Sequence, residues 1–212
     1  MKINIKYQHI AQFQTSHTIN RQEKEIWIVL HGYGQLAAFF LRKFEPLFRE
    51  DRLIIAPEAT NYGYLEGFSG RVGANWMTSH EREIAISNNH QYLNTLLESI
   101  LEKYQSRPLI KVLGFSQGAA TATRWVGQLS FPIDTLVLWG GGFAHDLIVS
   151  EVGQKLKDTQ MHIAIGSSDE FMTPESLKNQ EALIKNLDVT VKQHTYPGGH
   201  ELYLPLLQEI FQ

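Results

Sequence analysis

The sequence predicts an α/β fold in which a mostly parallel sheet is covered by helices on both faces. Short, continuous apolar runs, which are typical of strands buried on both faces, recur along the chain. Helix-length segments separate these runs. The 212 residues fall within the usual size of one domain, and no repeat, linker or low-complexity tract divides them. We therefore expect a single domain over residues 1–212.

The N-terminal part of the chain predicts three strands and a helix. Residues 3–7 alternate apolar and polar side chains, which indicates a half-buried strand. The apolar runs at 26–30 and 53–56 indicate buried strands. Between these two runs, apolar side chains at helical spacing predict a helix that ends near Pro46.

The middle of the chain predicts a long loop and a long helix. Residues 58–79 are rich in Gly, Asn and Tyr and predict no regular element, and loops of this length are often functional. Residues 81–104 carry apolar side chains at the spacing of an amphipathic helix, which Arg107-Pro108 ends.

The remaining chain alternates predicted strands with predicted helices, as a parallel sheet requires. The strands are expected at 109–113, 135–139, 161–165 and 189–193, and the helices at 117–129, 150–158, 174–187 and 201–211.

Composition excludes several classes of protein. A formal net charge of -3 and a pI near 6.3 give no attraction to phosphate backbones, so we expect no nucleic-acid partner. The absence of cysteine excludes disulfides, thiolate-bound zinc and a cysteine nucleophile. No apolar run approaches the roughly 20 residues of a membrane span or forms a signal peptide. We expect a cytoplasmic protein without integral membrane association.

Ser116 is the candidate nucleophile. It stands in Gly114-Phe115-Ser116-Gln117-Gly118, where an apolar strand runs into a predicted helix. This is the nucleophile-elbow pattern of the α/β-hydrolase fold, in which the flanking glycines relieve a sharp turn and the serine is exposed at the sheet edge. A glycine-containing turn without catalytic function is the alternative for the motif taken alone.

A serine hydroxyl needs a base, and in this fold the chain order is Ser, acid, His. His200 follows the last predicted strand in a glycine-rich loop, Pro197-Gly198-Gly199-His200, and is the preferred base. His162 and His194 fall within predicted strands, and His145 leaves only Asp134 as a possible acid.

Asp169 is the preferred acid. It lies in a loop beyond the strand that precedes the last one. Glu170 is the alternative, but the shorter side chain suits a fixed bond to imidazole. Thr173 and Pro174 follow as the cap and first turn of a helix.

The oxyanion of an acyl-transfer intermediate needs two N–H donors, usually the residue after the nucleophile and one from a loop after an early strand. Gln117 fits the first position. For the second, the glycines of His31-Gly32-Tyr33-Gly34 allow the Tyr33 N–H to face Ser116. His31 precedes the nucleophile and is interpreted as a structural residue of this loop.

With these residues assembled, the chain resembles the phospholipase/carboxylesterase family of α/β hydrolases, which includes bacterial carboxylesterases and acyl-protein thioesterases. The resemblance rests on LHGYGQ at 30–35, GFSQGAA at 114–120, GSSDEFMTPE at 166–175 and YPGGHEL at 196–202. It implies a small serine esterase with no large lid domain, a Ser116, Asp169, His200 triad and an oxyanion hole from Tyr33 and Gln117.

The chain departs from the family pattern at two motifs. Gln35 replaces a more usual aspartate, and Gly140-Gly141-Gly142 replaces a more usual Ser-Gly. Neither change removes a catalytic group.

The sequence therefore predicts hydrolysis of short to medium acyl esters, with no cofactor or metal. Thioester hydrolysis on acylated proteins or small carriers is the alternative, and a non-catalytic binding protein or a lyase on the same fold is a remote one. Trp76, Phe171 and Met172 lie in loops near the strand ends and are candidate substrate contacts. For Trp76, packing of the long loop onto the body is the competing interpretation.

Overall fold

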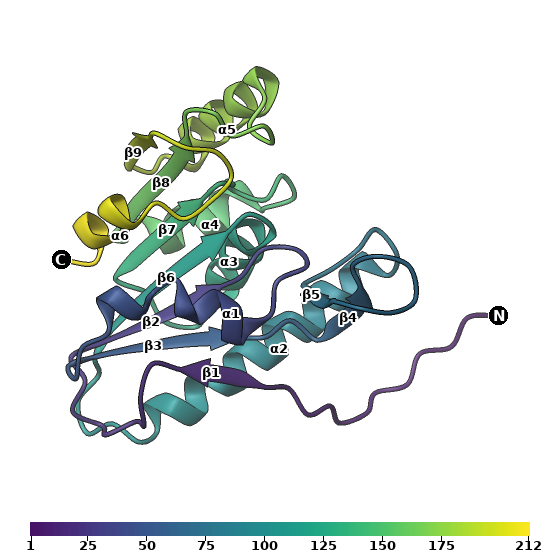
Figure 1. Cartoon of the computed structure of the whole chain (residues 1–212). Helices are drawn as coiled ribbons and strands as arrows, with labels where there is room; N and C mark the ends of the chain where they lie inside the picture. Colours follow the sequence, from purple (N-terminus) through teal and green to yellow (C-terminus); the bar gives the residue numbers. More distant parts are fainter.

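The computed structural model describes residues 1–212 and is built around a seven-stranded sheet (Figure 1). The strand order is β1-β3-β2-β6-β7-β8-β9, and every neighbouring pair is parallel except β1 with β3. The strands are β1 (Phe13–Thr15), β2 (Glu25–Leu30), β3 (Arg52–Pro57), β6 (Leu109–Phe115), β7 (Thr135–Trp139), β8 (Gln160–Gly166) and β9 (Val191–Tyr196).

Helices cover both faces of this sheet, as the sequence predicts. Side chains along β2 point alternately to the two faces, so Ile26 and Ile28 join one apolar core and Trp27 and Val29 join the other. All four are fully buried because helices lie on both sides. One face carries α2 (Arg82–Leu101), α3 (Gln117–Gln128), α4 (Val149–Leu156) and α5 (Pro174–Leu187), and the other α1 (Ala37–Arg42), the 3-10 helix η1 (Glu45–Leu47) and α6 (Leu204–Ile210) (Figure 1).

Helix α5 begins where the sequence predicts, whereas α1 begins with a cap that only the fold supplies. The Thr173 hydroxyl oxygen accepts a hydrogen bond from the Ser176 N–H (3.1 Å), and Pro174 opens the first turn of α5. The N-cap residue of α1 has no side-chain acceptor. Instead, the buried carboxylate of Glu58, just after β3, accepts from the Ala37 N–H (2.8 Å). No helix combines the length and the apolar character that crossing a membrane requires.

Two of the predicted elements are wrong. Residues 3–7 form no strand: residues 1–12 lie outside every helix and strand, because β3, the neighbour that pairs with β1, ends at Pro57. Residues 58–79 are not irregular throughout, since β4 (Asn61–Tyr64) and β5 (Val72–Asn75) pair as an antiparallel hairpin. Gly63 lies opposite Gly73 in this hairpin, so the apolar alternation that marks a strand is missing at that pair.

His162 of β8 and His194 of β9 form a stacked pair within the sheet. The Nδ1 of His162 and the Nε2 of His194 are 2.9 Å apart, and the rings are nearly parallel. Burial lowers the pKa of His162 to about 4, and the charges of His194 and Lys192 act in the same direction against the opposing effect of Glu209. One neutral imidazole can donate its N–H to the acceptor nitrogen of the other. Two imidazolium rings have no acceptor nitrogen and cannot form this hydrogen bond.

We expect the free energy of unfolding to decrease as the pH falls from about 6.5 towards 4. In this window the unfolded chain protonates His162 at its ordinary pKa, whereas the folded chain keeps it neutral. The unfolded state therefore binds more protons, and acid favours it. Urea denaturation at pH values across this window measures the effect.

His162→Gln should show a weaker pH dependence than the unmodified chain. His80→Gln, which changes an exposed histidine, serves as the matched control and should not. The same pH dependence in all three proteins would show that the pair does not contribute.

Candidate active site

Ser116 occupies the sharp turn between β6 and α3. Its backbone angles, φ 54° and ψ -118°, lie in a region that residues other than glycine avoid, so the turn is strained. The turn is fixed by two hydrogen bonds: the Ser116 N–H donates to the Trp139 carbonyl (2.8 Å), and the Ser116 carbonyl accepts from the Ala119 N–H (2.9 Å). The serine thus lies at the carboxyl end of the sheet and at the positive end of α3.

The glycines on either side of Ser116 allow this turn to pack backbone against backbone. A Cβ atom at Gly118 would lie 2.2 Å from the Leu30 carbonyl oxygen, and one at Gly114 would lie 2.3 Å from the Gly118 carbonyl oxygen. No side chain fits at either position. The contact brings the end of β2, and the loop that follows it, against the start of α3.

The three glycines after β7 lie at the same carboxyl edge of the sheet, where neighbouring atoms leave no room for side chains. Gly140 has a φ of +55°, and a Cβ there would lie 3.1 Å from the His200 ring. At Gly141 a Cβ would lie 2.8 Å from the Ser116 carbonyl oxygen, and at Gly142 it would lie 2.2 Å from the Gln180 side chain. The stretch that differs from the family pattern therefore leaves room for both the serine turn and the histidine. Three consecutive glycines directly after a buried strand were the available sequence signal.

Asp169 and His200 meet at this edge of the sheet. The Oδ2 atom of Asp169 accepts a hydrogen bond from the Nδ1 of His200 (2.9 Å), and its Oδ1 accepts from the Phe171 N–H (3.0 Å). The Asp169 side chain is fully buried. Because an ionised carboxylate only accepts hydrogen bonds, this contact puts a proton on Nδ1 and leaves Nε2 available as a base.

The alternative acid and the alternative bases do not take part in this contact. Glu170 is exposed and makes no hydrogen bond to His200. His145 is also exposed, and His162 and His194 pair with each other in the sheet. The Ser116 hydroxyl makes no hydrogen bond to His200 in this structure, a contact that in other enzymes often tightens only when substrate binds.

Two aromatic side chains at the ends of β7 and β9 form hydrogen bonds to the loop that carries His200. The Trp139 indole N–H (2.8 Å) and the Tyr196 hydroxyl (2.7 Å) both donate to the Glu201 carbonyl. The acid loop is joined to the same segment by the Ser168 N–H, which donates to the Gly198 carbonyl (2.9 Å). These bonds fix the imidazole relative to Asp169.

The candidate oxyanion loop lies directly against Ser116. A Cβ built on Gly32 would be 3.2 Å from the Ser116 Cβ. The Tyr33 N–H has no hydrogen-bond partner within the protein, and its side chain is exposed. Gln35, the residue that replaces the usual aspartate, closes the loop because its Oε1 accepts from the Gly32 N–H (2.9 Å).

The β4–β5 hairpin supports this loop from outside. The Gly34 N–H donates to the Ala74 carbonyl (2.8 Å), and the Ala74 N–H donates to the Gln35 carbonyl (3.3 Å). A Cβ at Gly73 would lie 2.5 Å from the Gly34 carbonyl oxygen, so the two backbones approach closely. The long segment that predicts only a loop is therefore part of the frame of the site.

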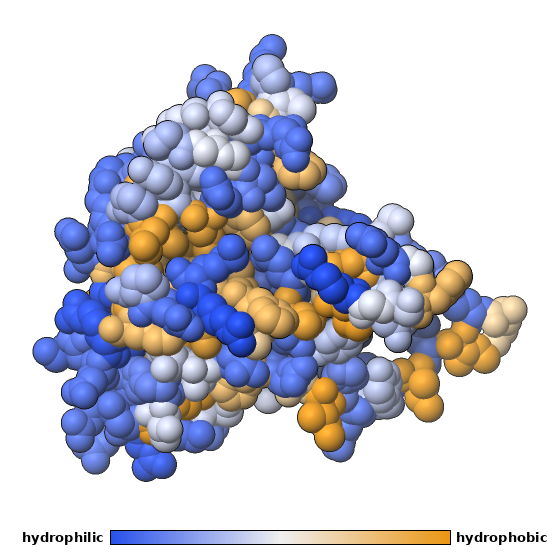
Figure 2. All heavy atoms as spheres, in the orientation of Figure 1, coloured by the Kyte–Doolittle hydropathy of each residue, from blue (hydrophilic) through white to orange (hydrophobic).

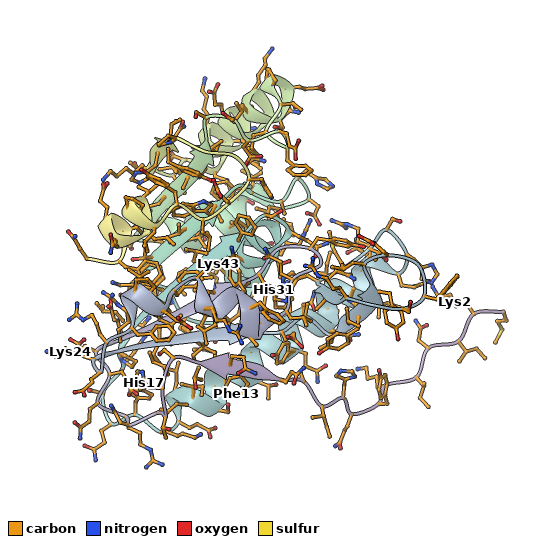
Figure 3. All side chains as sticks on the ribbon, viewed as in Figure 1. Lys2, Phe13, His17, Lys24, His31 and Lys43 are labelled. Carbon is orange, nitrogen blue, oxygen red and sulfur yellow. The ribbon has the colours of Figure 1, made fainter.

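His31 is a structural residue, as the sequence indicates. It is fully buried (labelled in Figure 3), and its Nε2 accepts from the Ala59 N–H (3.1 Å). Its Nδ1 therefore carries the proton and donates to the Gly32 carbonyl (2.7 Å). Burial lowers the pKa of His31, which keeps the ring in this neutral form.

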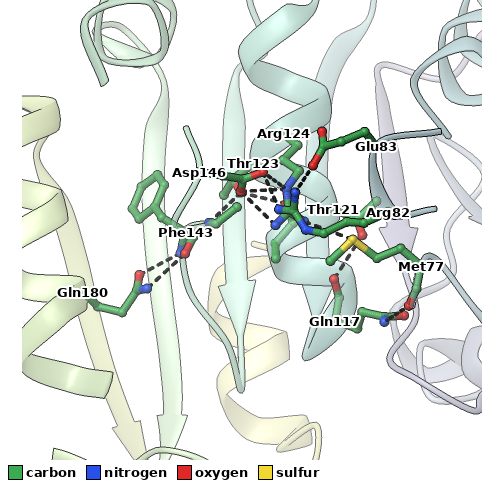
Figure 4. Close-up of polar contacts among 12 residues, drawn as sticks. Met77, Arg82, Glu83, Gln117, Thr121, Thr123, Arg124, Phe143, Asp146 and Gln180 are labelled. Carbon is green, nitrogen blue, oxygen red and sulfur yellow. Dashed lines mark hydrogen bonds and ion pairs between the residues drawn. The ribbon is translucent and has the colours of Figure 1, made fainter. Parts of the chain in front are cut away.

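Trp76 does not line the site, which corrects its assignment as a substrate contact. Its side chain has 0% exposure and packs against the His31 ring, and its indole N–H donates to the His31 carbonyl (2.8 Å). The Gln117 side chain spans the same segment: its Oε1 accepts from the Trp76 N–H (2.8 Å), and its Nε2 donates to the Met77 carbonyl (2.8 Å; Figure 4). Both side chains hold backbone near the candidate oxyanion donors.

An ion-pair cluster next to Met77 was not predicted from the sequence. Asp146 accepts from Arg124 of α3 (3.0 Å) and pairs with Arg82 of α2, and the Arg124 guanidinium also contacts the Met77 sulfur (Figure 4). Burial alone would raise the pKa of Asp146, but the hydrogen bonds from the two arginines hold it well below its usual range. The cluster ties two helices to the loop after β7. Its members are too far apart in the sequence to form a recognisable motif.

Phe171 and Met172 lie beside the acid. The Phe171 ring is 63% exposed, and its edge faces the His200 ring with 4.6 Å between centroids. Met172 is partly buried. No group of three or more His, Asp or Glu side chains is arranged to hold a metal ion.

A family model described as phospholipase/carboxylesterase matches residues 17–212. A comparison with curated proteins gives no significant match.

Among solved structures, acyl-protein thioesterase 2 of Zea mays superposes with a TM-score of 0.71 at 16% identity, covering 95% of this chain and 96% of that one. A phospholipase/carboxylesterase of Dyadobacter fermentans gives 0.68 at 21% identity, with 98% of each chain covered. A carboxylesterase of Mesorhizobium loti gives 0.69 at 15% identity, with 95% of this chain and 93% of that one covered. At these identities the likeness shows the fold.

We expect Gly118→Ala to destabilise the chain by about 1–3 kcal/mol, the usual cost of overpacking. The added methyl group would meet the rigid backbone of Leu30 at 2.2 Å. Urea denaturation measures the loss. Gly63→Ala is the matched control, since a Cβ there meets nothing within 4 Å, and equal losses in both variants would contradict the steric argument.

Proposed function

The chain belongs to the phospholipase/carboxylesterase family of α/β hydrolases, and from this premise we propose that it hydrolyses carboxylic esters through an acyl-enzyme on Ser116. The observation that carries the proposal is the Asp169–His200 hydrogen bond of 2.9 Å. It lies at the sheet edge where the strained turn places the half-buried Ser116, beside a loop whose Tyr33 N–H has no partner. Nucleophile, base, acid and oxyanion donor are thus available together.

In the first step, the Ser116 oxygen attacks the ester carbonyl carbon while the Nε2 of His200 takes the hydroxyl proton. The negative charge that develops on the carbonyl oxygen is stabilised by the N–H groups of Tyr33 and Gln117. The intermediate collapses, the C–O bond to the alcohol breaks, and His200 returns its proton to the leaving oxygen. Asp169 remains ionised and keeps the imidazole oriented.

In the second step, His200 takes a proton from water, and the resulting hydroxide attacks the acyl carbon. Collapse of the second intermediate releases the carboxylic acid and restores the Ser116 hydroxyl with the proton held on His200. Thioesters would be cleaved by the same sequence with a thiol as leaving group. Matched oxygen esters and thioesters therefore belong in one substrate panel.

We further propose that Phe171 contacts the substrate. Its exposed ring faces the imidazole edge-on, so a group bound at His200 would lie beside it. Met172 is assigned to the same contact. Short to medium acyl chains are the proposed substrates, since each methylene buried against such side chains contributes up to about 0.8 kcal/mol.

A fluorophosphonate probe should label the chain and should not label Ser116→Ala, because the probe reacts only with an activated serine.

Asp169→Asn should react with the probe and turn over ester more slowly, by a factor on the order of 10⁴, because the imidazole is then presented in the wrong tautomer. Mass spectrometry of the labelled peptide and initial ester hydrolysis rates measure both effects.

Glu170→Gln is the matched control and should keep the unmodified rate, since Glu170 makes no contact with His200. Labelling that persists in Ser116→Ala would exclude Ser116 as the nucleophile. If Glu170→Gln lost as much rate as Asp169→Asn, the assignment of Asp169 as the acid would be wrong.

Phe171→Ala should lower kcat/KM more for butyrate and hexanoate esters than for acetate, because the longer chains lose more buried contact. Rates with a series of acyl esters of one alcohol measure the trend. Phe13→Ala, on the edge strand β1, removes an exposed aromatic ring elsewhere and should leave the series unchanged. The same loss for every chain length would mean that Phe171 orients His200 and does not bind the acyl group.

A further inference from the structure

Residues 1–10, here called the N-terminal arm, expose an unusual amount of apolar surface. The arm extends away from the body (Figure 1) and lies outside the family match, which begins at residue 17. Figure 2 shows apolar side chains along its free length. Contiguous exposed apolar surface marks interaction sites in many proteins. The large apolar side chains, each at least 76% exposed, are Met1, Ile3, Ile5, Tyr7 and Ile10.

The arm has the side-chain pattern of a β-strand that lacks a neighbour. Ile3, Ile5 and Tyr7 alternate with polar residues, so they share one face of an extended chain. Tyr7 and His9 contact each other across this face, with 6.1 Å between ring centroids. Within the chain, only the ion pair between Lys2 and Glu81 joins an arm side chain to the body (Lys2 is labelled in Figure 3).

We propose that the partner of this arm is the same arm of a second copy, paired antiparallel about a two-fold axis at Ile5. In this register Ile5 faces Ile5 and Ile3 faces Tyr7, which places the apolar residues opposite one another. On the other face, Asn4 is opposite Lys6, and Lys2 is opposite Gln8. No lysine faces a lysine.

The neighbouring registers are less favourable. A shift by one pair in one direction sets Lys2 opposite Lys6, and a shift in the other direction sets Lys6 opposite Lys6. Like charges directly opposite each other destabilise a strand pair. A shift of one arm by a single residue places the apolar residues of one arm opposite the polar residues of the other. Among these registers, only the one centred on Ile5 pairs apolar residues with each other without placing two lysines opposite one another.

Charge also favours a second copy over a lipid surface. The arm has two lysines and no carboxylate, whereas the whole chain has a formal net charge of -3. Two arms carry like charges, so their pairing rests on the apolar face and on a register that keeps the lysines apart, whereas the negative net charge of the whole chain opposes approach to an anionic membrane. Because a pair of strands alone is only marginally stable, we expect a weak dimer whose population rises with protein concentration.

Disulfide trapping tests the contact and its register. The chain contains no cysteine, so one substitution introduces a single thiol. Ile5→Cys places two thiols opposite each other at the two-fold axis and should give a disulfide-linked dimer on mild oxidation. Ile10→Cys, on the same arm and at least as exposed as Ile5 but outside the paired residues 1–9, is the matched control and should give much less. Equal cross-linking of both variants would overturn the proposal.

Sedimentation equilibrium of the full chain supplies an independent test. Its mass should rise from that of one chain to that of two with concentration. Ile5→Asp should hold the chain as a monomer, because two carboxylates would face each other. Asn4→Glu should strengthen the dimer in a salt-sensitive way, because the new carboxylate faces Lys6. All these changes lie outside the candidate active site, so ester turnover should not change.

A monomeric mass at every concentration, together with no preferential Ile5→Cys cross-link, would overturn the proposal. A dimer that Asn4→Glu weakens would overturn the register. Arm-dependent binding to phosphatidylcholine and phosphatidylserine vesicles by a monomeric chain would assign the arm to a lipid surface instead.

Discussion

The close approach of the β6–α3 turn to the end of β2 determines the geometry of the candidate site. At Gly118 the start of α3 lies so near the Leu30 carbonyl that no side chain fits between them. The strained backbone of Ser116 is therefore held by contacts on both sides and not by its own preference. The same contact brings the loop after β2 alongside the serine, so that the candidate nucleophile and a candidate oxyanion donor are positioned by one packing constraint.

A second layer of polar contacts keeps that arrangement rigid. The neutral His31 ring bridges Gly32 and Ala59, and the Trp76 indole holds the His31 carbonyl. Gln117 then joins the start of α3 to the segment that carries Trp76. The polar side-chain groups of this network all have partners, which is the condition under which a buried network stabilises a single geometry. The β4–β5 hairpin, a small addition to the sheet, completes the frame from the solvent side.

The N-terminal arm shows the opposite situation, since it has the pattern of a strand but no neighbour to pair with. Open strand edges promote association, and most proteins shield them. In this chain the short strand β1 continues into the arm, and Lys2 and Lys6 alternate with the apolar residues. The lysines limit the registers in which such an arm can pair, so they direct association toward one geometry instead of preventing it.

The elements with strong local signals can be predicted from the sequence. The buried strands, the long helix over residues 81–104 and the G-x-S-x-G turn are predictable because periodicity and glycine placement are local properties. Asp169 and His200 are predictable as residues that follow strands, because the carboxyl ends of parallel strands share one edge.

Which side chains face that edge depends on tertiary packing and cannot be predicted from local sequence. Trp76 and Phe171 are both apolar loop residues near strand ends, yet one is buried under the oxyanion loop and the other is exposed beside His200. The β4–β5 hairpin forms backbone hydrogen bonds with the candidate oxyanion loop, and the Arg82–Asp146–Arg124 cluster joins residues far apart in the chain. Such contacts are set by the packing of distant segments, which leaves no periodic trace in the sequence.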